Sequence, residues 1–94
     1  MEEIQCLHAI VEGRVQGVGF RAFTEQHARI KELRGWVRNR QDGTVEIEAE
    51  GPKPVLEAFL VTLDEGPPLA RVTQIVVDWK AANRQSNEFT VRLD

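Results

Sequence analysis

The order in which two kinds of apolar spacing follow each other constrains the fold of this chain most strongly. Apolar residues at every second position predict strands, and those at every third or fourth position predict helices. The patterns come in the order strand, helix, strand, strand, helix, strand, with a last short strand. Strands are predicted at about 4–12, 35–40, 45–50, 72–79 and 88–93, and helices at about 21–33 and between 52 and 66.

This order predicts an α+β fold. Right-handed crossovers turn a βαββαβ order into a split βαβ arrangement, an antiparallel sheet with two helices on one face. In this topology the third strand lies between the first and second strands and runs antiparallel to both. The first and second strands are therefore parallel to each other, and we expect both to end at the same edge of the sheet.

A glycine-rich run at residues 13–21 joins the first strand to the first helix. It reads Gly-Arg-Val-Gln-Gly-Val-Gly-Phe-Arg, and its glycines allow positive φ angles and close approach of a ligand to the backbone. The amides of such a turn and the start of a helix together bind anions. Arg21 lies in the first turn of that helix, where its planar guanidinium can meet phosphate oxygens. The run predicts a site for a phosphoryl group.

Asn39 ends the second predicted strand, and the topology brings it beside the glycine run and Arg21. An asparagine at the end of a strand is more often a turn former than a catalytic group. Its predicted place opposite the run favours a functional role.

Composition and charge limit the classes of function. The chain has 94 residues, enough for one domain over 1–94, with a formal net charge of −3. This charge argues against general binding to nucleic acid or anionic membranes. Cys6 is the only cysteine, so the chain has no intrachain disulfide or cysteine-based metal site. The chain shows no signal peptide and no apolar run of about 18 residues, so we expect a cytoplasmic protein.

Several residues have simpler interpretations than catalysis. His8 and His27 are expected to be packed or partly exposed, and Cys6 to be a small apolar filler. Four residues are predicted to form the apolar stripe of the first helix, Phe20, Phe23, His27 and Ile30. Three alternating glutamates are predicted to form a solvated strand face rather than a metal cluster, Glu46, Glu48 and Glu50.

Residues 17–22 also fit the G-x-G-x-x-A pattern of dinucleotide-binding folds, with Asp42 about the right distance beyond. A single match of this kind is weak evidence. The chain is too short for a doubly wound sheet, and Asp42-Gly43 is a hairpin signal that accounts for Asp42. The glycines could also serve only as a structural turn.

With these motifs established, the chain resembles the acylphosphatase family. The resemblance rests mainly on residues 13–21 and 35–39, the second continuing through 42–45, with support at 50–51 and 68–72. It implies a ferredoxin-like fold and hydrolysis of acyl phosphates to a carboxylate and phosphate, without a metal or organic cofactor. It also implies that Arg21 binds the phosphoryl group and that Asn39 orients the attacking water.

The remaining expectations concern the phosphate site and its partners. The predicted phosphate-binding residues are Gln16, Gly17, Val18, Gly19, Phe20 and Arg21. No Ser or Cys lies in the run, and a carboxylate leaves readily, so direct attack by water is favoured. Inorganic phosphate and sulfate should compete with a small acyl phosphate substrate, and the protein should be a monomer. Where the family often has an apolar residue and a glycine, this chain has Lys31 and Glu32.

Two other classes of function stay open. One is a non-enzymatic module of the same fold that binds phosphate or carbamoyl phosphate; the presence of both Arg21 and Asn39 argues against it. The other is a small RNA-binding sheet, which needs exposed aromatic residues and a basic face. This chain has no Tyr and is acidic.

Overall fold

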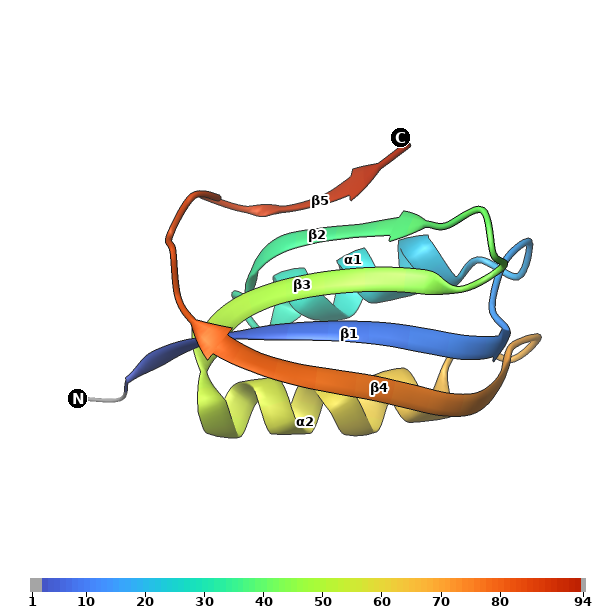
Figure 1. The fold of residues 1–94 in the computed structure, drawn as a ribbon, viewed down its shortest axis with the longest axis horizontal. Coiled ribbons are helices and arrows are strands. Elements are labelled where there is room, and N and C mark those ends of the chain that lie inside the picture. Colours follow the sequence, from blue (N-terminus) through green and yellow to red (C-terminus); the bar gives the residue numbers. More distant parts are fainter. Residues whose placement is uncertain (1–2, 94) are drawn as a thin grey trace.

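A computed structural model of the chain describes residues 3–93. Within these residues the chain forms one five-stranded sheet and two helices (Figure 1). The predicted order of elements is confirmed. The elements are β1 (Ile4–Arg14), α1 (Phe20–Ile30), β2 (Arg34–Asn39), β3 (Val45–Pro52), α2 (Lys53–Glu65), β4 (Arg71–Ala81) and β5 (Phe89–Arg92).

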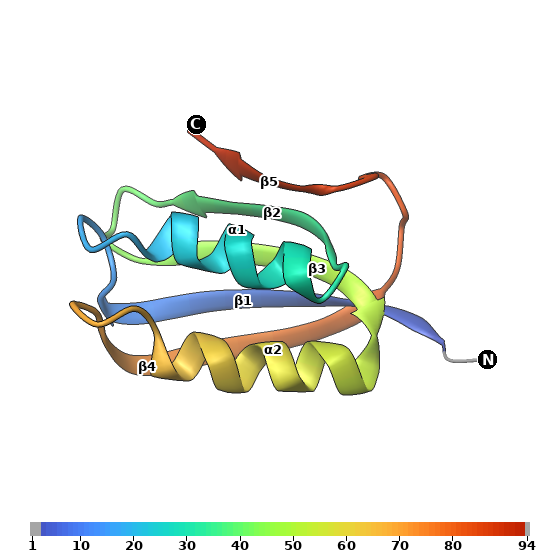
Figure 2. The same cartoon turned by 180° about the vertical axis from the view of Figure 1, so that it is seen from behind.

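The sheet has the strand order β4-β1-β3-β2-β5. As predicted, β3 lies between β1 and β2 and pairs antiparallel with both. Both helices cover one face of the sheet (Figure 2). The loop after β1, which contains the glycine-rich run, and the hairpin after β2 therefore lie at the same end of the sheet (Figure 1).

The prediction of a purely antiparallel sheet is wrong at one edge. β5 pairs with β2 in parallel, so the sheet is mixed. The cause is the direction of the chain. β4 stops at the end of the sheet where β2 begins, and residues 82–88 cross that end of the sheet to reach β5. Phe89 is fully buried and its carbonyl oxygen accepts a hydrogen bond from Nη2 of Arg29 at 2.9 Å. This contact ties β5 to α1.

The core lies between the sheet and the helices. On β1, Leu7, Ala9 and Val11 face this core: they are buried and lie opposite buried residues of β3. Full burial of one large apolar side chain contributes about 1.5–3 kcal/mol. The buried residues of α2 are Leu56, Phe59 and Leu63.

The predicted apolar stripe of α1 is only partly correct. The buried residues of this helix are Phe20, Thr24 and Ala28, whereas Ile30 is 67% exposed. Thr24 can be buried because its Oγ1 donates a hydrogen bond to the carbonyl oxygen of Phe20 at 2.8 Å. The rings of Phe23 and His27 contact each other at the side of the helix, with centroids 4.5 Å apart.

α1 ends at Ile30, three residues before the predicted end, because Glu32 adopts the left-handed conformation with φ 58°. The amide of Leu33 donates to the carbonyl oxygen of Ala28 at 2.8 Å, and the amide of Glu32 donates to that of Arg29 at 3.0 Å. Such a helix end usually has glycine at the left-handed position. Glutamate occupies that position here.

Glu32→Gly is expected to stabilise the protein. The left-handed conformation costs a non-glycine residue about 1–2 kcal/mol, and glycine gives part of this back through its larger entropy loss on folding. The expected gain is about 0.5–1 kcal/mol in the free energy of unfolding, measured by urea denaturation. Glu57→Gly, in the exposed middle of α2, is the matched control and should lose about 1 kcal/mol. A loss of stability in Glu32→Gly would contradict the cap assignment.

The glutamates of β3 are less solvated than predicted. Oε1 of Glu46 accepts a hydrogen bond from Nε of Arg38 at 2.7 Å, and Oε2 lies 2.7 Å from Nε2 of His8. Burial acts to raise the pKa of Glu46, but these two contacts outweigh it and the pKa is lowered. The prediction is wrong for Glu50, which is buried and accepts hydrogen bonds from the backbone amides of Asn83 and Arg84.

Cys6 is buried, as expected for a small apolar filler. Burial, with the charge of Glu48 next in size, raises the pKa of its thiol to about 11. The thiol is therefore protonated at neutral pH and a poor nucleophile. Between residues 3 and 93 no three His, Cys, Asp or Glu side chains gather as a metal site requires. No helix in that range is long and apolar enough to cross a bilayer.

Candidate active site

The glycine loop, residues 15–19, leaves β1 and enters α1. Gly17 and Gly19 have φ angles of 74° and 81°, and Gly19 is the N-cap residue of α1. A Cβ atom at either position would meet no atom within 4 Å, so the backbone conformation, not lack of space, requires glycine. Val15 and Phe20 are buried on either side and anchor the loop to the core.

The start of α1 is not capped by the protein. Gly19 makes no side-chain cap, and the first turn contains no acidic residue. The helix begins with a hydrogen bond from the amide of Phe23 to the carbonyl oxygen of Gly19 at 3.0 Å. Among the described residues, no hydrogen bond from the amides of residues 17–22 is found. These donors and the positive end of the helix can therefore meet an anion.

Arg21 is the second residue of α1 and is partly buried. Across residues 3–93 its guanidinium has no ion pair or hydrogen bond, so its donors are available to a ligand. It lines a hollow of about 170 Å³, which we call the cradle. The cradle is lined by Val15, Gly17, Gly19, Phe20, Arg21, Ala22 and Asn39.

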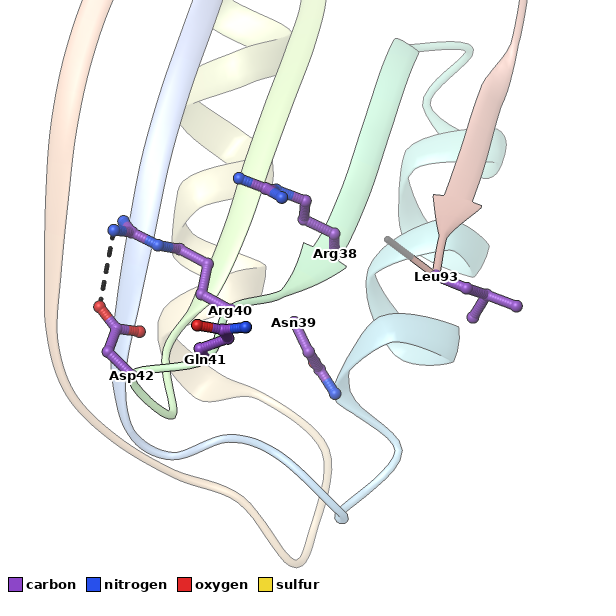
Figure 3. A pocket seen from close by; sticks show the side chains of 6 residues that line it. All are labelled: Arg38, Asn39, Arg40, Gln41, Asp42 and Leu93. Carbon is purple, nitrogen blue, oxygen red and sulfur yellow. Dashed lines mark ion pairs between the residues drawn. The ribbon is translucent and has the colours of Figure 1, made fainter.

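Asn39 is the last residue of β2 and lies opposite Val45 of β3. Its side chain points towards the glycine loop (Figure 3). Its Oδ1 is buried and has no hydrogen-bond partner within the described part of the chain. A buried acceptor without a partner costs about 1–3 kcal/mol. The structure thus brings Asn39, the loop and Arg21 together, as the topology predicts.

The other predicted phosphate-binding residues differ in position. Gly17, Gly19 and Phe20 line the cradle, whereas Gln16 and Val18 are not among its lining residues. The side chain of Gln16 instead bonds the β2–β3 hairpin: its Nε2 donates to the carbonyl oxygens of Arg40 at 2.7 Å and Thr44 at 2.9 Å. Only the backbone of Gln16 can thus serve an anion. The sequence shows a polar residue in the loop but does not show that it reaches the hairpin.

A second, more open hollow of about 570 Å³ adjoins the cradle at Asn39 (Figure 3). Nη2 of Arg40 lies 3.6 Å from Oδ2 of Asp42. The hydroxyl and amide of Thr44 donate to Oδ1 of Asp42 and lower its pKa. Asp42 is thus held in the hairpin turn, and the sheet is not doubly wound, so the dinucleotide interpretation is wrong. This hollow is lined by Arg38, Asn39, Arg40, Gln41, Asp42 and Leu93.

Comparison with known proteins identifies the family. Residues 7–91 match the family model for acylphosphatase. The chain belongs to the acylphosphatase family. The match contains the whole glycine loop, Arg21 and Asn39, so every residue that lines the cradle lies within the acylphosphatase region of the chain.

Relatives and solved structures agree with this assignment. The acylphosphatase of Salinibacter ruber is 50% identical over 84 residues, which cover 89% of this chain and 88% of that protein. The acylphosphatase of Anaeromyxobacter sp. is 46% identical over 92 residues, which cover 98% of this chain and 99% of that protein. The crystal structure of acylphosphatase from Bacillus subtilis superposes with a TM-score of 0.91 at 42% identity. The superposition covers 94% of this chain and 98% of that chain. The ferredoxin-like α+β fold expected of an acylphosphatase is confirmed.

Proposed function

We propose that this chain hydrolyses the bond between the carboxyl and phosphoryl groups of acyl phosphates, releasing a carboxylate and phosphate. One observation carries the proposal. Arg21, the unbonded amides of the glycine loop and Asn39 surround a single hollow. A binding group for phosphate and a group that can hold water thus lie side by side.

The glycine loop and Arg21 would bind the phosphoryl group. Phosphoryl transfer depends mainly on positioning and on stabilising negative charge on the phosphoryl oxygens. The amides of residues 17–22, in the loop and at the start of α1, supply donors that need no rearrangement during the reaction. The guanidinium of Arg21 adds a charged, planar pair of donors that can grip two oxygens.

Asn39 would hold the attacking water. Its side-chain amide has both a donor and an acceptor, and the nitrogen end, which points towards the glycine loop (Figure 3), can donate a hydrogen bond to that water. The carboxylate is a good leaving group and needs little protonation. We therefore assign direct attack of water on phosphorus, without a covalent intermediate on the protein. The loop from 15 to 19 contains no Ser or Cys that could act as a nucleophile.

The main alternative is a module of the same fold that binds phosphate or carbamoyl phosphate without turnover. The presence of Asn39 beside the loop and Arg21 favours the enzyme. Binding of phosphate alone needs only donors for its oxygens, which the loop amides and Arg21 already supply. A further amide that can hold a water molecule is needed for hydrolysis.

Turnover of benzoyl phosphate tests the proposed function. We expect hydrolysis with one phosphate released for each benzoate, and competitive inhibition by inorganic phosphate and sulfate. Acetyl and carbamoyl phosphate should be assayed beside it to define the acyl group that is accepted. Binding of phosphate without turnover of any of the three compounds would instead establish the binding module.

Activity is expected to survive a chelator. The proposed mechanism assigns charge stabilisation to backbone amides and Arg21, so a metal ion has no task in it. Turnover of benzoyl phosphate should change by less than about 20% after treatment with EDTA and removal of the chelator. Loss of turnover that returns on addition of Mg²⁺ or Zn²⁺ would contradict this mechanism.

We also propose that the chain acts as a single domain and as a monomer. The loop, Arg21 and Asn39, to which the reaction is assigned, meet within a single chain, so the proposed reaction needs no second subunit. Sedimentation at the concentrations used in the assay would test this point. Activity that rises with protein concentration faster than linearly would contradict it.

A further inference from the structure

Gln16 connects the two segments that form the cradle. It lies in the glycine loop, and its side chain reaches the hairpin between β2 and β3, 24 and 28 residues further along the chain. Both hydrogen bonds leave from the same atom, Nε2, at 2.7 Å to the carbonyl oxygen of Arg40 and 2.9 Å to that of Thr44. An amide nitrogen has two hydrogens, so this group is fully used.

The two carbonyls that Gln16 binds are those at the base of the hairpin. The amide of Arg40 donates to the carbonyl oxygen of Thr44 at 2.9 Å, which closes the turn. The amide of Gly43 donates to the carbonyl oxygen of Arg40 at 3.3 Å. Gln16 therefore binds the hairpin where its conformation is already fixed. Its side chain thereby fixes the position of the glycine loop relative to Arg40, the residue directly after Asn39.

Asn39 depends on this support because its own side chain is not held. Within residues 3–93 the side-chain amide of Asn39 makes no hydrogen bond. Its place relative to the loop is thus set by its backbone, which β3 holds on one side through pairing with Val45. β5 gives no support at this point, because its pairing with β2 ends at Arg38.

We infer that Gln16 is a positioning residue for the reaction: it fixes the distance between the phosphate-binding loop and Asn39. The inference rests on the proposed function and extends it to a side chain that touches neither substrate nor water. Removing the two hydrogen bonds would leave the loop amides and Arg21 able to bind phosphate. It would let Asn39 shift relative to the phosphoryl group, and a misplacement of about 1 Å can cost about 100-fold in rate.

Gln16→Met tests the inference, because methionine keeps the length of the side chain but donates no hydrogen bond. With benzoyl phosphate we expect kcat to fall about 10- to 100-fold. The inhibition constant for phosphate should change by less than about threefold, because the phosphate donors are untouched. Gln16→Asn, which keeps the amide but is one methylene shorter, should behave similarly and serves as a second variant if Gln16→Met folds poorly.

A double-mutant cycle with Asn39 distinguishes positioning from a general structural role. If Gln16 acts through Asn39, the variant that combines Gln16→Met with Asn39→Ala should be no slower than Asn39→Ala alone. Arg29→Met is the matched control, because Arg29 also donates from its side chain to a distant carbonyl, that of Phe89, away from the cradle. It should lower the melting temperature but leave kcat within about twofold.

The outcomes separate the inference from the proposed function. If the wild-type chain does not hydrolyse benzoyl phosphate, both fail. If it does, the inference alone is overturned by any of three results. These are a kcat of Gln16→Met within about twofold of wild type, a parallel loss of phosphate binding, or effects that multiply in the double mutant. All rates should be measured at a temperature where circular dichroism shows each variant to be folded.

Discussion

Replacing Asn39 by alanine is expected to lower kcat by at least about 100-fold while phosphate still inhibits at a similar concentration. The phosphate donors belong to the glycine loop and Arg21, which the substitution does not touch. The substitution removes only the side-chain amide that we propose holds the attacking water. The measurements are kcat with benzoyl phosphate and the inhibition constant for phosphate. A fall of only a few-fold, or loss of phosphate binding together with turnover, would show that Asn39 is structural.

Two comparisons sharpen this prediction. Asn39→Asp should be as slow or slower, because a carboxylate beside the phosphoryl group adds repulsion and lacks the donor. Gln41→Ala, which changes another amide side chain close to Asn39, should keep kcat within about twofold. Asn39→Ala also removes a buried acceptor without a partner, so its stability should equal or exceed that of the wild type. Marked destabilisation would indicate a structural role.

Arg21→Lys is expected to lower kcat/KM about 100-fold and to weaken inhibition by phosphate. Lysine keeps the charge but has no planar pair of donors that can bind two phosphate oxygens. Within the described residues Arg21 has no ion pair or hydrogen bond, so the fold should be intact. Arg34→Lys, at the exposed start of β2 and the opposite edge of the sheet, is the matched control. Turnover of Arg21→Lys close to that of the wild type would show that Arg21 does not bind the phosphoryl group.

The sequence predicts the meeting of Arg21 and Asn39 because that meeting follows from topology alone. The apolar spacings give the order of the elements, and the order places β3 between β1 and β2, antiparallel to both, so that β1 and β2 run parallel to each other. The ends of these two strands then lie at one edge whatever the details of packing. The glycine spacing allows, but does not by itself require, the positive φ angles that the structure has at Gly17 and Gly19.

Other features depend on contacts that spacing does not record. The buried face of α1 could not be predicted, because Thr24 becomes a core residue only once its hydroxyl bonds the carbonyl oxygen of Phe20. The parallel pairing of β5 depends on the path of residues 82–88, which buried Glu50 holds through backbone amides. The role of Gln16 likewise depends on the conformation of the hairpin, which brings two carbonyls to the same donor.

The central claim of this account is that water attacks phosphorus and the carboxylate leaves. Hydrolysis of benzoyl phosphate in water labelled with heavy oxygen tests it most directly, with mass spectrometry of both products after a single turnover. We expect the label in inorganic phosphate and none in benzoate, because the loop, Arg21 and Asn39 would all act on the phosphoryl group. Label in benzoate would show attack on the carbonyl carbon and would contradict the roles assigned to Arg21 and Asn39.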